Sequence, residues 1–271
     1  MTHALPALFV SHGAPTLPLE DRPASTFLRG LLDALPERPK AILVVSAHYE
    51  TMSPEVSTAE TPETIYDFGG FPPALYQMTH KAPGAPDVAR RAAELLREAG
   101  GSVRENPARG YDHGVWTPLK LMDPGATIPV ASLSVVHGQS AAWHYAYGRA
   151  LAPLRDEGVL IIGSGAATHN LRAFMMSRPR IEDERDEARG FADALGRALE
   201  GGDWDAVLAG PDGLEGGRWN HPSDDHILPL YVAMGAGGEG AAGKRIHAST
   251  NYGVIAMDAY AFDSPEALQA A

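Results

Sequence analysis

The chain has 271 residues, of which 44% are hydrophobic and 21% charged, enough apolar material for one domain with a large core. Its formal net charge is -12, and its Lys and Arg residues are scattered along the sequence rather than clustered. The sequence therefore predicts no basic surface patch, which argues against nucleic acid and anionic membranes as partners. It contains no cysteine, so disulfides and thiolate sites are excluded and any metal must be held by His, Asp or Glu.

The N-terminus MTHALPALFV lacks the charged start and the cleavage site of a signal peptide. No apolar run approaches the roughly 20 residues of a membrane-spanning helix. The sequence therefore predicts a cytoplasmic protein.

The first fifty residues predict a strand, a helix and a second strand. Ala4 to Val10 is a short apolar run before His12, Pro23 to Leu35 has apolar residues at helical spacing, and Ala41 to Glu50 contains an unbroken apolar run before His48. The run without alternation is typical of a strand that is covered on both faces. A βαβ unit makes its two strands parallel, so His12 and His48 are expected at the same edge of a sheet, where ligands usually bind.

An irregular stretch rich in aromatic residues, Pro and Gly follows, from Thr61 to Gly84. It favours a binding loop or lid, with a packing loop over the core as the alternative. Pro86 to Ala99 is a predicted helix. Arg109 to Pro118 is a predicted Gly- and aromatic-rich loop that contains His113.

The middle of the chain predicts a third strand that leads to a histidine. A strand at Ile128 to Val135 and a helix at Gln139 to Glu157 precede the apolar run Gly158 to Ser164, which enters a small-residue turn before His169. The Gly-Ser-Gly in this turn has neither the phosphate-loop nor the nucleophile-elbow spacing.

The C-terminal third predicts helices and an edge hairpin. Glu182 to Leu199 is an amphipathic helix, Pro222 favours a helix start within Arg218 to Ala236, and Arg245 to Phe262 contains two alternating strands. Residues 264–271 are expected to be a frayed tail. The predicted fold is α/β: a single domain, residues 1–263, with a central, mostly parallel sheet flanked by helices and a C-terminal edge hairpin.

Six histidines stand at positions that this fold sends towards one edge of the sheet: His12, His48, His113, His169, His221 and His226. Histidine is the commonest ligand of borderline divalent metals, and without cysteine it is the natural ligand for Zn or Fe(II) here. The pattern therefore predicts a metal site. A set of hydrogen-bonded structural histidines is the alternative.

Six motifs around these histidines resemble the class III extradiol ring-cleaving dioxygenases, and most closely the LigB-type subgroup. They occur in family order and span nearly the whole chain: SHGAPTL, VVSAHYET, YDFGGFP, RGYDHGVWTPL, GSGAATHNL and NHPSDDH. The resemblance implies a single catalytic LigB-type domain, and a non-haem Fe(II) enzyme that opens a small, DOPA-like catechol with O2 to a semialdehyde.

The resemblance also assigns roles to individual residues. His12, His48 and His221 would bind the metal, His169 would be the acid/base, and His113 and His226 would line the catechol pocket. Beside the resemblance, the need for an acid and a base makes His113 the second catalytic candidate. The aromatic loop, through Tyr66 and Phe71, would contact the substrate ring. His169 is sometimes counted as a ligand in Zn-loaded members of the family.

One position departs from the broader superfamily, which completes its metal site with a carboxylate where this chain has His221. Three neutral ligands also suit Zn(II), so Fe(II) is expected for activity and Zn(II) is the alternative metal. Two other functions stay open: a Zn hydrolase that uses the same histidines, and a non-catalytic binding protein of this fold. A homodimer is one of the assemblies that the sequence leaves open.

Overall fold

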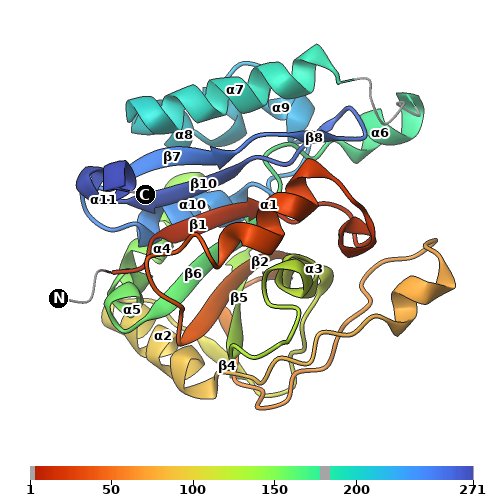
Figure 1. The fold of residues 1–271 in the computed structure, drawn as a ribbon. Coiled ribbons are helices and arrows are strands. Elements are labelled where there is room, and N and C mark those ends of the chain that lie inside the picture. The colour runs from red at the N-terminus through yellow and green to blue at the C-terminus, as the bar shows by residue number, and fades with distance from the viewer. Residues whose placement is uncertain (1–3, 178–183, 271) are drawn as a thin grey trace.

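The computed structural model describes residues 4–177 and 184–270. An eight-stranded sheet runs through the molecule in the order β4-β3-β5-β2-β6-β1-β10-β7 (Figure 1). Its strands are β1 (Ala7–Ser11), β2 (Ala41–Thr51), β3 (Glu55–Ser57), β4 (Arg104–Asn106), β5 (Val130–Val136), β6 (Val159–Gly165), β7 (Ala242–His247) and β10 (Ala259–Asp263). The four central strands β5, β2, β6 and β1 are parallel. This confirms the predicted α/β fold with a mostly parallel sheet.

The predicted C-terminal hairpin is also present. Strand β10 pairs antiparallel with both β1 and β7, so β7 forms the edge of the sheet and β10 lies inside it. The chain between them forms a second, two-stranded sheet of β8 (Thr250–Asn251) and β9 (Ile255–Ala256).

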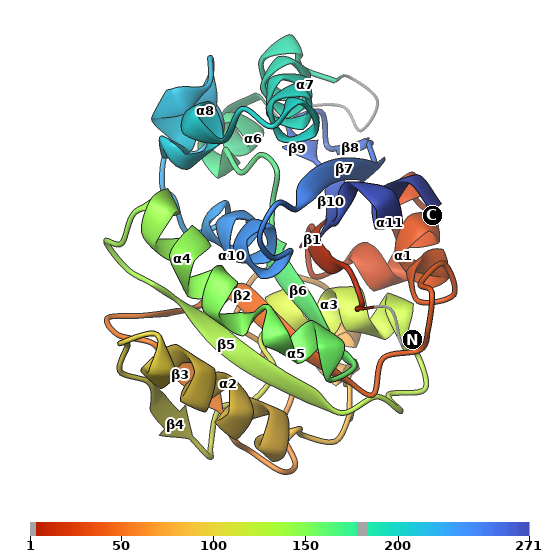
Figure 2. The ribbon, with the colours of Figure 1, turned by 90° about the vertical axis from the view of Figure 1, so that its left-hand side faces the viewer.

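Helices cover both faces of the sheet (Figures 1 and 2). One face packs against α2, α4 and α10, and the other against α1 and α3. The helices are α1 (Pro23–Leu31), α2 (Pro86–Glu98), α3 (His113–Met122), α4 (Ala141–Leu151), α5 (Pro153–Asp156), α6 (Leu171–Ser177), α7 (Asp186–Gly201), α8 (Trp204–Leu208), α9 (Gly217–Asn220), α10 (Leu228–Ala236) and α11 (Pro265–Ala270), with short 3-10 turns at Leu17–Leu19, Pro73–Gln77 and Gly210–Gly213.

The position of β2 between two hydrophobic cores explains why apolar and polar residues do not alternate in its sequence. Leu43 and Val45 point into the core beneath α2, α4 and α10, whereas Ile42 and Val44 point into the core beneath α1 and α3. All four side chains are at most 1% exposed. Successive residues of a strand face opposite sides, so a strand with two cores must be apolar at every position.

Several local predictions were wrong. The segment 109–118 is not all loop, because α3 begins at His113, where the Asp112 side chain caps the helix by accepting from the Val115 N–H. The helix expected after Pro222 begins only at Leu228, because Pro229 occupies its first turn and Pro222 follows the end of α9.

Within the segment expected to be a frayed tail, α11 covers Pro265–Ala270, and the Leu268 carbonyl accepts a hydrogen bond from Lys244 Nζ at 2.9 Å. The predicted helix 139–157 is divided into α4 and α5, with Pro153 at the start of α5. The predicted helix 182–199 begins at Asp186 as α7, and positions 182 and 183 lie outside the described residues.

Gly165, at the end of β6, lets the chain before α10 approach the sheet closely. A Cβ at this position would lie 2.1 Å from the carbonyl oxygen of His226. Gly165→Ala is therefore expected to lower the unfolding free energy by about 1–3 kcal/mol, because the backbone on one side must move. Urea unfolding measures this change.

Gly190 offers the matched control, because it lies in α7 and no atom stands within 4 Å of the place that an added methyl group would take. Gly190→Ala is expected to raise the unfolding free energy by about 0.5–1 kcal/mol, the ordinary helix-propensity gain. Equal unfolding midpoints for Gly165→Ala and the wild type would contradict the close approach at β6.

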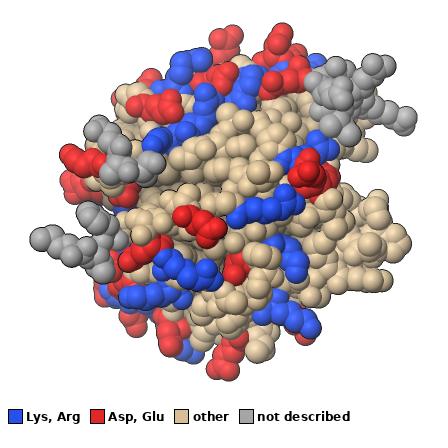
Figure 3. Space-filling model, viewed as in Figure 1, with Lys and Arg blue, Asp and Glu red and all other residues tan. Residues whose placement is uncertain are grey.

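Acidic and basic side chains are mixed on the face shown in Figure 3, with uncharged surface between them, in keeping with the scattered Lys and Arg of the sequence. Among residues 4–177 and 184–270, no helix combines the length and the apolar character needed to cross a bilayer.

Candidate metal centre and catalytic site

Five histidines from separate segments of the chain meet beyond the carboxyl ends of β1 and β6. The Nε2 atom of His48 lies 3.2 Å from Nε2 of His12 and 3.2 Å from Nε2 of His226. The ring centroid of His113 lies 3.7 Å from that of His48, and the ring of His169 stacks on that of His226 at 3.4 Å. The predicted meeting of His12 and His48 at one edge of the sheet is confirmed.

Parallel strands bring His12 and His48 together although the two strands are not neighbours. Strand β6 lies between β1 and β2 and pairs with both. His12 directly follows β1, where its N–H donates to the Gly165 carbonyl at 3.0 Å. His48 lies in β2, where the pairing with β5 shifts register between Ser46 and Glu50. Such irregularities commonly re-aim a side chain.

The chain after β6 and the chain before α10 hold His169 and His226 against each other. The His226 carbonyl accepts from the Ala166 N–H at 2.9 Å, and the His169 N–H donates to the Asn220 carbonyl at 2.9 Å. The two imidazole planes are 12° apart. Backbone hydrogen bonds thus hold the main chain of both residues in place, although neither residue belongs to a helix or strand.

Three of the rings direct an unprotonated nitrogen towards one another. His226 Nδ1 donates to the carboxylate of Asp225, and His48 Nδ1 lies 3.3 Å from Oδ2 of Asp67. His12 Nδ1 lies 3.2 Å from Oγ of Ser164, whose hydroxyl proton is donated to the Gly114 carbonyl. A ring nitrogen that faces such an acceptor carries the proton, so each Nε2 keeps its lone pair.

Burial favours the neutral form of His12 and His48. Burial, and then the nearby His48, hold the pKa of His12 well below its usual value. Burial, and then His113 and His226, lower the pKa of His48 to about 2. Neutral imidazoles with converging lone pairs are the donor set of a Zn or non-haem Fe site. The side chains of His12, His48 and His113 also lie close enough to one another to share one ion. The residues present therefore fit a divalent metal.

The structure does not bring His221, which the sequence analysis expects to be the third ligand, into this cluster. Its side chain is fully buried, and Nε2 donates to the Ala167 carbonyl at 2.9 Å. Its Nδ1 has no hydrogen-bond partner within the described residues, and its ring lies against Phe191. Because the carbonyl is only an acceptor, Nε2 carries a proton and cannot bind a metal.

The aromatic loop predicted as a lid reaches the cluster through two residues to which the sequence analysis gave no role. Phe68 lies 5.8 Å from the ring of His113, and the Asp67 carboxylate faces both His48 and His113. Phe71 packs on Phe68 at 5.3 Å, one ring removed from the histidines. The sequence did offer a reason to consider Asp67. A histidine that binds a metal usually donates its other ring N–H to a carboxylate or carbonyl, and Asp67 is the carboxylate within the YDFGGFP motif.

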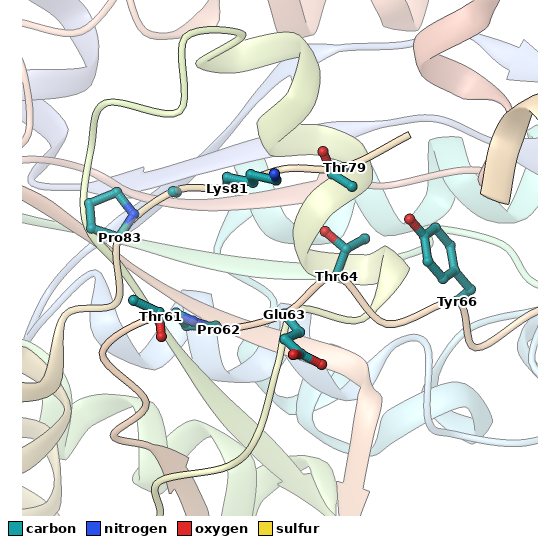
Figure 4. A pocket seen from close by; sticks show the side chains of 9 residues that line it. Thr61, Pro62, Glu63, Thr64, Tyr66, Thr79, Lys81 and Pro83 are labelled. Carbon is teal, nitrogen blue, oxygen red and sulfur yellow. The ribbon is translucent and has the colours of Figure 1, made fainter. Parts of the chain in front are cut away.

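Tyr66 lies at a separate cavity of about 590 Å³ between residues 61–66 and 79–83 (Figure 4). Its hydroxyl donates to the Met78 carbonyl at 3.0 Å. None of the five clustered histidines lines this cavity. The structure therefore gives Tyr66 no contact with the cluster, and a substrate role for it stays a prediction.

Comparisons with known proteins agree with the site. A model of the catalytic LigB subunit of aromatic ring-opening dioxygenase matches residues 6–262. The chain is 42% identical to a 4,5-DOPA dioxygenase extradiol of Beta vulgaris over 94% of this chain and 96% of that protein. It is 41% identical to one of Escherichia coli K12 over 86% and 85%.

A crystal structure of an uncharacterized protein from Escherichia coli K12 superposes with a TM-score of 0.78 at 32% identity, covering 95% of this chain and 99% of that one. The motifs, the histidine cluster and these relatives lead to one assignment. The chain belongs to the LigB family and is an extradiol, aromatic ring-opening dioxygenase, a non-haem metal-dependent enzyme that acts on a catechol with O2.

Proposed function

We propose that the enzyme opens a small catechol beside its two hydroxyls, with Fe(II) held by His12, His48 and His226. The observation that carries this proposal is the convergence of three unprotonated Nε2 atoms, with His48 Nε2 at 3.2 Å from the other two. His226 takes the place that the sequence analysis gave to His221.

The relatives support a catechol that bears an amino acid side chain. Plant and bacterial proteins that are 41–42% identical to this chain are named 4,5-DOPA dioxygenase extradiol. We infer that DOPA or a similar small catechol is the substrate, and that the product is a ring-opened semialdehyde. The predictions of a cytoplasmic location and of a homodimer stand beside this proposal.

Bound at these histidines, Fe(II) would supply the one-electron exchange that lets a singlet catechol react with triplet O2. The chain itself must orient the ring, move protons and exclude water.

His169 is suited to move the proton of a catechol hydroxyl. Burial, and then the stacked His226, lower its pKa to about 2, so it is neutral and has a lone pair that can accept a proton. An anionic substrate beside it would raise that pKa and so favour the transfer. His113 is the second candidate, because its ring lies between His48 and Phe68.

Phe68 is the loop side chain best suited to pack against a catechol ring. It touches His113 on one side and Trp116 on another, with centroids at 5.8 and 6.1 Å. Phe68→Ala is expected to raise KM about tenfold with a smaller effect on kcat, because a lost aromatic contact of about 1–1.5 kcal/mol acts mainly on substrate binding. Steady-state O2 uptake at several catechol concentrations measures both constants. An unchanged KM would contradict this contact.

Oxygen uptake tests the function directly. Protein loaded anaerobically with Fe(II) is mixed with DOPA and other catechols, and O2 consumption is recorded with the visible absorbance of the semialdehyde. Fe(II) protein that consumes no O2 with any catechol would contradict the proposed substrate class. A second candidate, a Zn hydrolase, is favoured by the donor set of three histidines. Ester or amide cleavage by the Zn-loaded protein would support it.

A further inference from the structure

We propose that Asp67 is a positioning residue, whose one carboxylate sets the tautomer of His48 and the position of His113 and so joins the aromatic loop to the metal centre. This inference rests on the proposed role of His48 as a ligand. Asp67 lies in the loop 61–84, outside the strand that holds His48.

The carboxylate divides its two oxygens between the two histidines. Oδ2 lies 3.3 Å from Nδ1 of His48. Oδ1 accepts a hydrogen bond from the backbone N–H of His113 at 3.0 Å and lies 3.0 Å from Nδ1 of the same residue. Its side chain is 22% exposed, so solvent screens these contacts only in part.

The contact to His48 decides which nitrogen can bind the metal. With Nδ1 protonated towards Asp67, Nε2 keeps its lone pair and faces His12 and His226. If the proton moved to Nε2, His48 could not be a ligand. Partners of this kind commonly change metal affinity or activity by about 10–100-fold when they are removed.

The substitution Asp67→Asn distinguishes a role in setting the His48 tautomer from a role in packing alone. Asp67→Asn keeps the size of the side chain but has a single oxygen, which the His113 N–H holds on its side. The NH2 group then faces His48 Nδ1, which must become an acceptor, so the ring proton moves to Nε2. The amide therefore acts on the ligand His48 rather than on the fold.

The test is titration of the metal-free protein with Co²⁺, followed by the absorption of the bound ion. Asp67→Asn is expected to raise the Co²⁺ dissociation constant about 10–100-fold and to change the d–d spectrum, with unchanged thermal unfolding of the metal-free protein. Asp87→Asn is the matched control, because Asp87 carries the same charge on α2 with a side chain 99% exposed. It is expected to match the wild type in affinity, spectrum and activity.

Phe68→Ala serves as the second control, since it disturbs the same loop and leaves the carboxylate in place. Its Co²⁺ affinity is expected to equal that of the wild type. A dissociation constant for Asp67→Asn within twofold of the wild type, or an equal loss in Phe68→Ala, would overturn the role of Asp67. Wild-type protein that binds no Co²⁺ would instead contradict the proposed metal site itself. Wild-type protein that binds Co²⁺, but whose Fe(II) form turns over no catechol, would contradict only the substrate.

Discussion

His226→Ala is expected to remove the metal from the protein, as is His48→Ala. The Nε2 atoms of both residues belong to the converging group, so each substitution takes away one of three proposed ligands. The loss should exceed the roughly 100-fold upper range seen when only a supporting partner is removed. Metal content after anaerobic loading with Fe(II), and separately with Zn(II), measures the effect.

Two other histidines make this comparison specific. His137→Ala is the matched control, because its ring is 62% exposed and pairs with Glu50 on the surface. His221→Asn tests the residue that the sequence favoured. Because His221 Nε2 is bound to the Ala167 carbonyl, this variant is expected to keep its metal. Full metal occupancy in His226→Ala, together with loss in His221→Asn, would reverse the assignment.

His169→Ala is expected to keep the metal and to lose ring cleavage, with kcat lower by about 10²–10⁴-fold. His169 stacks on the proposed ligand His226, so its ring would lie beside the bound catechol. General acid and base catalysis by such a residue commonly raises the rate by about 10²–10⁴-fold. The measurement pairs metal content with the rate of semialdehyde formation under saturating catechol and O2.

Metal loss decides between the two roles of His169. It lies in a group with Asp225 and His226 whose side chains could share an ion, so a ligand role is the competing interpretation. If His169→Ala loses as much metal as His48→Ala, His169 is a ligand rather than only an acid/base. A kcat within threefold of the wild type, with metal present, would exclude both roles.

The sequence was sufficient for the framework of the site. An unbroken apolar run before His48 predicted a strand with two cores, and Ile42 and Leu43 do point into different cores. The βαβ unit then fixed the relative direction of β1 and β2, because the helix returns the chain to the end of the sheet at which the first strand began, which makes the two strands parallel. That rule alone was enough to bring His12 and His48 to one edge, although β6 lies between their strands.

Local geometry was harder to predict where a single residue outweighs the pattern. The Asp112 cap turns a Gly- and aromatic-rich segment into the start of α3, and Pro229 rather than Pro222 begins α10. The Gly-Ser-Gly that the sequence predicted as a turn forms the last three residues of β6. Its Gly165 allows a backbone approach from a segment about sixty residues later, which no local pattern records.

By itself, the sequence determined an α/β fold, two of the proposed ligands and the family to which the motifs belong. Only the tertiary structure showed that His226 and not His221 lies in the histidine cluster. The difference lies in the partner of each ring nitrogen. His221 Nε2 donates to the Ala167 carbonyl, whereas His226 Nδ1 donates to Asp225 and leaves Nε2 of His226 facing His48. The carbonyl of Ala167 and the ring of His48 come from distant segments, so no spacing along the chain could have predicted them.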